Sequence, residues 1–488
     1  MRIFKKILCV AVCFAIVCLA VPLAGCGFDS TVAKAAKKLN NYSIEASFDD
    51  EKKTIVATEK FEAKFGEDRK ELWFHLYGRA FRENANILPY AETSKAKCFP
   101  AGESFGSLEI KDVKINGQGV SFSYGGEDEN VLKVGSNIKK GQKVVVEIKF
   151  ELVLANCTHR LGYFDNNINL GNWYPVLCVY EAGAYVANPY YSVGDPFYSE
   201  CANYCVQLSY PESYTIGCTG SEKTITDSGI KTTKMEAKAV RDFAIVLGKN
   251  FALRSTKFEN TTINYLGYEY DEDLDANLET AKRALKTFNE LFGEYPYRTL
   301  TVAKTPFLFG GMEYPNLVWI ADNITDKIEI TKVIAHEIAH QWWYGLVGNN
   351  EVAYSYIDES LAEYSTVLFF EKNDCYGYSG KQMVQDAATS FELYSEVIDS
   401  IKGTVNDTLN QPTTAFSTEY EYVYVVYVKG TLFLDALSDK VGEKAFVLTL
   451  KKYCKKFRFK IATRDDFVEM FSKTAGDDIS DFFAEWKA

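Results

Sequence analysis

The sequence predicts an α+β protein, with a β-rich N-terminal saddle or sandwich domain followed by a mostly α-helical C-terminal domain. Two observations support this prediction. From about Tyr42 to Val246, short β-prone runs alternate with turn signals, as in large β-domains. From about Phe258 onward, apolar residues recur at helical spacing. We therefore place a boundary near residue 256, between domains 27–256 and 257–488.

The strand predictions in the first half rest on alternation and on turn residues. The β-prone runs Tyr42–Phe48 and Thr54–Phe65 flank the polar segment Asp49–Lys53, which predicts a hairpin. Val120–Tyr124 alternates and ends at two glycines. Lys143–Leu154 is a long β-branched run that follows a glycine-containing turn, so we expect another strand there.

The helix predictions in the second half rest on a period of 3.6 residues. Asp273–Phe292 places Leu274, Leu278, Ala281, Leu285 and Phe288 on one side, and Gly293 ends the pattern. Thr299–Lys304 and Leu317–Ala321 are predicted strands. Further helices are expected over residues 330–347, 359–372, 381–400, 428–441, 443–456 and 464–472.

Composition narrows the class of protein. The chain has 488 residues, of which 47% are hydrophobic, so it has enough apolar material for sizeable cores. The formal net charge of −12 argues against nucleic acid as a partner, because phosphate binding needs clustered Lys and Arg. Only 4 histidines are present, so any site that uses imidazole draws on a short set.

The first 25 residues have the pattern of a secretory signal. Arg2, Lys5 and Lys6 precede an uncharged apolar run over residues 7–23, and small residues follow at Ala24 and Gly25. The Leu-Ala-Gly-Cys segment ending at Cys26 resembles a bacterial lipobox, which implies cleavage before Cys26 and a lipid anchor on its thiol. An uncleaved membrane anchor is the alternative. Both interpretations place the protein outside the cytoplasm, attached to a membrane, and cleavage would leave a net charge of −12 − 3 = −15.

Eight cysteines follow Cys26, and their spacing leaves their state open. They are Cys98, Cys157, Cys178, Cys201, Cys205, Cys218, Cys375 and Cys454. An even number in an oxidising compartment permits disulfides, but the pairing does not follow from the sequence. Buried free thiols are the equal alternative. No C-x-x-C pair is present, which argues against a thiolate metal site.

The segment His336-Glu337-Ile338-Ala339-His340 is an H-E-x-x-H motif. On a helix, residues four apart share a face, so both imidazoles can reach one ion. Zinc needs a third protein ligand, and Glu359 is the candidate because it opens the next predicted helix after an 18-residue connection. One turn further on, Glu363 is a candidate hydrogen-bond partner for a ligand histidine, with a surface position as the alternative.

These motifs resemble the gluzincin metallopeptidases, and specifically the aminopeptidase N-like family. Two further segments agree: Gly310-Gly311-Met312-Glu313 is similar to the family's G-x-M-E-N exopeptidase loop, and Tyr427-Val428-Lys429-Gly430 is similar to its Y-x-K-G segment. In the first half, Gly194-Asp195-Pro196-Phe197 fits the family more loosely. The resemblance implies a saddle-shaped β-domain packed on a thermolysin-like zinc peptidase domain.

The resemblance also implies roles. One Zn²⁺ per chain would be held by His336, His340 and Glu359, with Glu337 as general base. Tyr427 would donate a hydrogen bond to the oxyanion, with Tyr422 as a second tyrosine facing the site. The alternative for this Tyr-rich stretch is an amphipathic strand over residues 420–424.

The loop before the metal motif would read the substrate's free end. Glu313 would bind the α-ammonium group by a charge-assisted hydrogen bond, while Gly310, Gly311 and Met312 line the substrate. Tyr314-Pro315 replaces the family's Asn after Glu313, which we expect to reshape the pocket for the first side chain. The second amine-binding group that the family usually takes from its β-domain is not placed. The chain stops soon after the catalytic domain should end, so we expect a more open site than in relatives with a large C-terminal helical domain.

The leading hypothesis is therefore an extracytoplasmic, lipid-anchored zinc aminopeptidase that acts on peptides with a free N-terminus. A thermolysin-type zinc endopeptidase is one alternative, and it needs no role for Glu313. A catalytically idle lipoprotein that binds peptides or envelope partners is the other.

Overall fold

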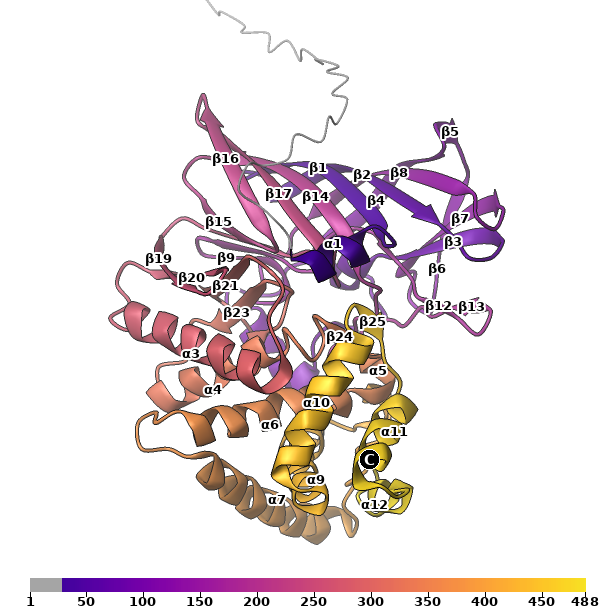
Figure 1. The fold of residues 1–488 in the computed structure, drawn as a ribbon. Coiled ribbons are helices and arrows are strands. Elements are labelled where there is room, and N and C mark those ends of the chain that lie inside the picture. Colours follow the sequence, from indigo (N-terminus) through magenta and orange to yellow (C-terminus); the bar gives the residue numbers. More distant parts are fainter. Residues whose placement is uncertain (1–28) are drawn as a thin grey trace, which may run out of the picture.

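The computed structural model describes residues 29–488, so the predicted signal and Cys26 lie outside the described residues. The N-terminal half is β-rich and the C-terminal half is mostly helical, which confirms the predicted α+β class (Figure 1). The predicted boundary at residue 256 falls within strand β19 (Phe251–Phe258).

A sheet of eight strands dominates the N-terminal half (Figure 1). β1 and β2 form an antiparallel hairpin across residues 50–53, as the polar turn predicts. β8 continues the sheet beyond β2, and its residues alternate between buried and more accessible positions because its inner face packs on the core. In pairing order, the strands are β16 (Ser221–Asp227), β17 (Ile230–Val240), β14 (Ala202–Pro211), β1 (Asn40–Asp49), β2 (Thr54–Lys64), β8 (Lys143–Val153), β4 (Ser107–Ile115) and β5 (Gln118–Gly119).

Three smaller sheets complete the β-rich half. The first has the order β15 (Thr215–Cys218), β18 (Ile245–Gly248), β10 (Asn167–Leu170), β9 (Leu161–Phe164). The second has the order β11 (Val176–Leu177), β3 (Arg69–His75), β7 (Val131–Ile138), β6 (Phe122–Gly125). The third pairs β12 (Tyr180–Glu181) with β13 (Ala184–Tyr185). Short helices lie at α1 (Ser30–Ala36), η1 (Tyr77–Phe81), η2 (Glu92–Ser94) and α2 (Lys95–Cys98).

The C-terminal half opens with a five-stranded sheet that leads into the helices. Its order is β19, β20 (Thr261–Tyr268), β21 (Thr299–Thr305), β23 (Leu317–Ala321), β22 (Gly311–Met312). Helix α3 (Leu274–Phe292) buries the face that the sequence predicts, and it ends at Gly293, whose φ of 108° favours glycine.

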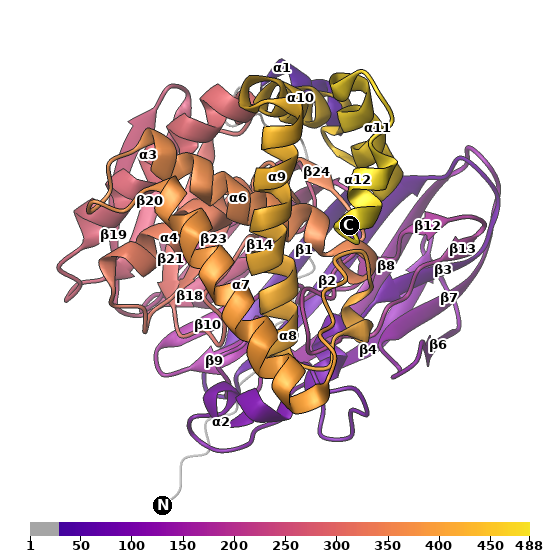
Figure 2. The same ribbon diagram turned by 90° about the horizontal axis from the view of Figure 1, so that it is seen from below.

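The remaining elements are helical apart from one two-stranded pair, β24 (Val347–Gly348) with β25 (Lys460–Ile461). The helices are α4 (Lys327–Ala339), α5 (Glu351–Tyr354), α6 (Tyr356–Lys372), α7 (Gly380–Lys402), η3 (Thr413–Ala415), α8 (Glu419–Tyr422), the π-helix η4 (Val423–Lys429), α9 (Gly430–Val441), α10 (Glu443–Phe457), α11 (Arg464–Ala475) and α12 (Ser480–Glu485). Seen from below, α7 and α9 extend along the helical face of the molecule (Figure 2).

Two local predictions are wrong. The helix predicted over residues 330–347 ends at Ala339, because the N–H groups of Gln341 and Trp342 bond to carbonyls only three residues back. Tyr344, with a φ of 115°, then turns the chain. The alternative of an amphipathic strand at residues 420–424 is also wrong, because this stretch is helical through α8 and η4. In both places tertiary packing outweighs the local pattern.

The state of the cysteines and the membrane question can be described only for residues 29–488. Within that range the structure contains no disulfide. Cys201, for example, is a buried thiol. None of the helices in the same range combines the length and the apolar character needed to cross a bilayer.

Candidate active site

The metal motif lies at the end of helix α4. Asp326 caps the helix by accepting hydrogen bonds from the backbone N–H groups of Ile328 and Glu329, and His340 ends it. His336 and His340 lie one turn apart, so their Nε2 atoms approach to 3.1 Å. The helix therefore presents both imidazoles to a single point.

Helix α6 supplies the two carboxylates that the sequence predicts. The Oε2 atom of Glu359 lies 3.2 Å from the Nε2 atom of each histidine. The Oε2 atom of Glu363 lies 2.8 Å from Nδ1 of His336. Both contacts follow from the packing of α6 against α4, so the structure brings the predicted ligand set together.

The donor set fits a divalent metal ion. Nδ1 of His340 lies 2.8 Å from the carbonyl oxygen of Trp343, and Nδ1 of His336 faces Glu363, so each Nδ1 donates a proton. Each Nε2 is then an unprotonated acceptor, and the two lone pairs converge with the Glu359 carboxylate. The three ligand atoms lie within 4.8 Å of one another, and all three residues are buried. Two histidines and one glutamate form the ligand set of a catalytic zinc.

Glu337 lies beside this group with one oxygen uncommitted. Its side chain is buried, and among the described residues its Oε2 atom has no hydrogen-bond partner. Burial raises the pKa of Glu337 to about 7. A Cβ atom on Gly311 would lie 2.3 Å from Glu337 Oε1, so β22 approaches the carboxylate closely only because residue 311 is glycine.

Tyr427 reaches the centre from the π-helix η4. The Tyr427 ring lies 5.7 Å from the His336 ring at an interplanar angle of 25°. The Tyr422 ring packs edge-on against the Tyr427 ring, with the ring centres 5.8 Å apart. In a π-helix the i→i+5 hydrogen bonds widen the turn, so residues five apart are brought to the same side. Both tyrosines that the sequence predicts at the site are therefore there.

The loop between β22 and β23 lies beside the site. β22 is an edge strand that pairs with β23, and Glu313 follows it directly. Glu313 is buried, and burial followed by the neighbouring Asp195 carboxyl raises its pKa well above the usual range. Gln341 fixes the loop, because its Nε2 atom donates to the carbonyl oxygens of Glu313 and Tyr314.

Tyr314, which departs from the family pattern, links the loop to the β-rich half. Its ring is buried against Trp319, and its hydroxyl lies 3.1 Å from Oδ1 of Asn172. A Cβ atom on Gly171 would lie 1.8 Å from the Tyr314 hydroxyl oxygen. The substitution therefore packs the loop onto the segment after β10.

Sequence reasoning missed the contribution of Asp195 and Arg160 from the β-rich half. The two form a short buried ion pair. Nε of Arg160 lies 3.0 Å from Sδ of Met312, and its guanidinium lies 4.5 Å from the centre of the Phe309 ring. Burial raises the pKa of Asp195, and the Arg160 charge opposes that shift. The Glu359 carboxyl also raises the pKa of Asp195. The Gly-Asp-Pro-Phe segment was the available signal, but the sequence does not show which loop it meets.

Comparison with known proteins matches residues 276–486 to the Peptidase family M1 domain. The chain is 26% identical over 296 residues to Aminopeptidase 2 of Candida albicans, covering 56% of this chain and 30% of the relative. It is 28% identical over 235 residues to Aminopeptidase N of Lactobacillus delbrueckii subsp. lactis, covering 44% and 27%. It is 30% identical over 200 residues to human Aminopeptidase B, covering 38% and 29%. The chain thus spans less than a third of the length of these relatives.

Solved structures extend the comparison to most of the chain. The M1 zinc metallopeptidase from Deinococcus radiodurans superposes with a TM-score of 0.66 at 16% identity, covering 92% of this chain and 93% of that chain. A mutant of that protein bound to a Tyr-Ser-Ala substrate gives a TM-score of 0.63 at 16% identity, covering 92% and 94%. Likeness at this identity shows that both halves share the fold. Residues 276–486 are therefore similar to the Peptidase family M1 domain, both halves share the fold of an M1 zinc metallopeptidase, and the His336, His340 and Glu359 group has the ligand set of a zinc site.

Proposed function

We propose that this chain is a zinc-dependent aminopeptidase that removes N-terminal residues from peptides. The observation that carries the proposal is the placement of two buried carboxyl groups, Glu313 and Asp195, beside the group formed by His336, His340 and Glu359. An exopeptidase needs both features, because it must cleave a peptide bond at a fixed distance from a charged chain end.

His336, His340 and Glu359 would hold the zinc ion. When bound, zinc supplies Lewis acidity, which activates water and polarises a carbonyl group. Glu363 and the Trp343 carbonyl orient the histidines through their Nδ1 atoms. This keeps both Nε2 atoms available as ligands.

Glu337 is positioned to move the proton. Its Oε2 atom is buried and has no partner among the described residues, so a water molecule or a substrate amide can bind there without displacing a protein contact. We assign Glu337 the role of accepting a proton from the attacking water and passing it to the leaving amine.

Tyr427 is the donor that we assign to the developing oxyanion. Its ring lies along His336, and its hydroxyl interacts with the Glu359 carboxyl, so this donor lies beside the metal ligands. A preorganised donor in a buried site stabilises such charge strongly, since no water reorganises during the reaction.

Glu313 and Asp195 would bind the substrate's α-ammonium group. Burial raises the pKa of both carboxyls, so each gains from a nearby cation. Arg160 holds Asp195 in place and contacts Met312, which ties the two carboxyl-bearing segments together. The edge strand β22 has an unpaired side on which the substrate backbone can add as a short strand.

The test compares a free with a blocked N-terminus. We expect the purified protein to hydrolyse an aminoacyl-anilide and to leave its N-acetylated analogue intact. Glu313→Gln should lower kcat/KM on the free substrate by about 100-fold, which corresponds to a lost charge-assisted contact of ~2.7 kcal/mol. Glu329→Gln, which alters an exposed residue at the start of α4, is the control.

The alternatives predict different outcomes. Equal cleavage of the blocked substrate would favour a thermolysin-type endopeptidase. A protein that contains zinc and has no activity on either substrate would favour an idle binding lipoprotein. Chelation should remove one zinc per chain together with the activity, and both should return when zinc is added back.

We also propose that the chain is exported and tethered to a membrane through lipid on Cys26. The support is the basic, apolar and small-residue pattern of residues 2–26. Cys26→Ser should move the protein from the membrane fraction to the soluble fraction and abolish metabolic labelling with a fatty-acid analogue. A variant that stays in the membrane fraction would favour an uncleaved anchor.

A further inference from the structure

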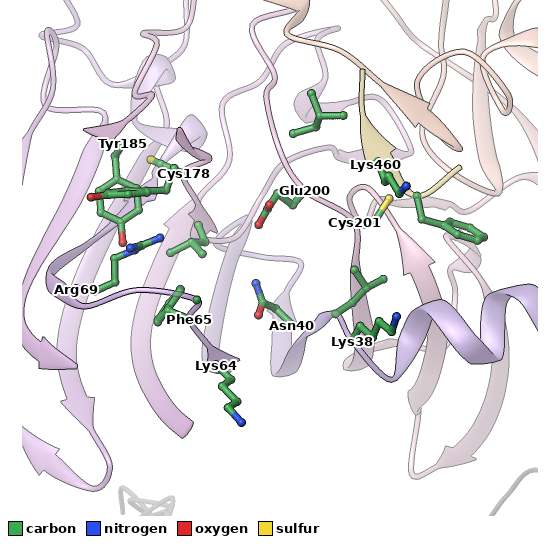
Figure 3. Close-up of a pocket in the computed structure, with 16 residues that line it drawn as sticks. Lys38, Asn40, Lys64, Phe65, Arg69, Cys178, Tyr185, Glu200, Cys201 and Lys460 are labelled. Atoms are coloured by element: carbon green, nitrogen blue, oxygen red, sulfur yellow. The ribbon is translucent and has the colours of Figure 1, made fainter. Parts of the chain in front are cut away.

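A hollow of about 490 Å³ lies where the two halves of the chain meet (Figure 3). It is lined by the segment that joins α1 to β1, by the turn between β2 and β3, and by residues 459–461 around β25. Its lining shares no residue with the group around His336, so it is a separate feature of the molecule.

The hollow is basic in an otherwise acidic chain. Lys38, Lys64, Arg69 and Lys460 line it, and Glu200 is the only acidic residue in the lining that the structure describes. We call this set the basic pocket. Figure 3 shows Arg69 and Lys64 on one side and Lys38 and Lys460 on the other, with Glu200 between them. Among the described residues, Arg69 pairs with Glu67, whereas the three lysines make no ion pair within 4.0 Å. The pocket therefore holds excess positive charge.

Arg69 is the fixed part of the basic pocket. Its side chain is only 8% exposed, and its guanidinium lies 3.5 Å from the centre of the Tyr180 ring. Nη1 is 3.3 Å from the Asp68 carbonyl, but Nε is buried and has no hydrogen-bond partner among residues 29–488. A buried donor on a cation is costly when it lacks an acceptor, so this atom indicates a missing oxygen ligand.

We propose that the basic pocket binds a phosphate group. The planar guanidinium matches phosphate oxygens, while the three lysines on flexible stems supply point charges around it. Counting Glu67, which pairs with Arg69, four cations face two carboxyl groups, and the remaining positive charge suits a dianion better than a monoanion. The phosphate is either inorganic phosphate or the phosphate of a glycerol-phosphate headgroup.

The experiment is calorimetric titration of the full zinc-loaded chain with inorganic phosphate and, separately, with glycerol 3-phosphate at constant ionic strength. We expect saturable binding of one phosphate per chain. Tighter binding of glycerol 3-phosphate would identify a headgroup as the source, and tighter binding of inorganic phosphate would identify the free ion. Both results support the pocket.

Matched variants locate the binding. Arg69→Gln should weaken it at least tenfold, and Arg254→Gln, which removes an equal charge from exposed β19, should change it less than twofold. Lys64→Gln on the pocket rim, paired with Lys223→Gln on exposed β16, gives the same comparison if Arg69→Gln fails to fold. The proposal is overturned if neither ligand binds at 20 mM, or if binding is unchanged in the pocket variants, as binding at the zinc would be.

Discussion

At the residue scale, Glu337 carries the sharpest prediction for the chemistry. Glu337→Gln removes the proton acceptor but keeps the size of the side chain and all three metal ligands. We expect kcat to fall by a factor of about 10²–10⁴, because general base catalysis contributes that much. The zinc content and Tm should stay unchanged. Glu329→Gln on the same helix serves as the control, and a fall in kcat of less than tenfold would remove Glu337 from the proposed role.

The residues of the candidate active site differ in whether the sequence alone can predict them. His336, Glu337 and His340 are recoverable because helical spacing alone brings them together. Glu359 and Glu363 follow from the next helix and from the family resemblance. Asp195 and Arg160 are not recoverable, because two separate segments of the β-rich half carry them, and no local period in the sequence predicts that these segments meet the metal motif.

A second residue prediction concerns Glu59 in the core of the eight-stranded sheet. Glu59 is fully buried, neither carboxyl oxygen has a partner among the described residues, and burial raises its pKa well above 4.5. The folded state thus keeps a proton that the unfolded chain releases above about pH 4.5, so stability falls as the pH rises until the buried carboxyl ionises. Glu59→Gln should raise the free energy of unfolding at pH 8 by ~1–3 kcal/mol and should flatten this pH dependence.

Thermal unfolding from pH 5 to pH 8 checks this prediction. Glu45→Gln on the adjacent strand β1 is the matched control, since Glu45 is exposed. Parallel Tm profiles for Glu59→Gln and the unsubstituted chain would contradict the argument.

At the element scale, the close approach of edge strand β22 to Glu337 can be tested with substitutions at two neighbouring glycines. A Cβ atom on Gly311 would lie 2.3 Å from Glu337 Oε1, whereas one on Gly310 would meet only Cγ2 of Val333 at 3.7 Å. We expect Gly311→Ala to lower kcat/KM by more than tenfold because the base or the strand must move, and Gly310→Ala to change it less than threefold. Steady-state kinetics with zinc analysis checks both, and equal losses in the two variants would contradict the contact.

Elements also differ in how far sequence reveals them. The hairpin β1–β2 and helix α3 follow from alternation, turn residues and a period of 3.6, and the structure has them within two residues of the predicted bounds. Strand β22 is too short to leave a periodic signal. The π-helix η4 differs from an α-helix only in one widened turn, which serves to place Tyr422 and Tyr427 together and has no composition of its own.

At the scale of the whole molecule, one buried arginine joins the halves next to the active site. Arg241 donates from Nε to the Tyr344 carbonyl at 2.7 Å, from Nη1 to the Ser199 carbonyl at 2.6 Å and from Nη2 to the Lys460 carbonyl at 3.0 Å. Tyr344 follows Trp343, whose carbonyl orients His340. These hydrogen bonds of Arg241 between the two halves, which we call the seam, therefore fix the metal ligand His340 through the backbone. No sequence motif encodes such a long-range arrangement.

Arg241→Met keeps the apolar stem and removes these three hydrogen bonds. We expect the free energy of unfolding to fall by ~3–5 kcal/mol, since three buried carbonyls lose charged donors. Zinc affinity should fall as well, because the turn that holds His340 loosens. Arg254→Met, which alters an exposed arginine paired with Asp275, should cost less than ~1 kcal/mol. Calorimetric unfolding and zinc titration measure both effects. If Arg241→Met lowered stability but left zinc affinity intact, the seam would hold the halves together without governing the site; if it changed neither, the contact would carry no energetic weight.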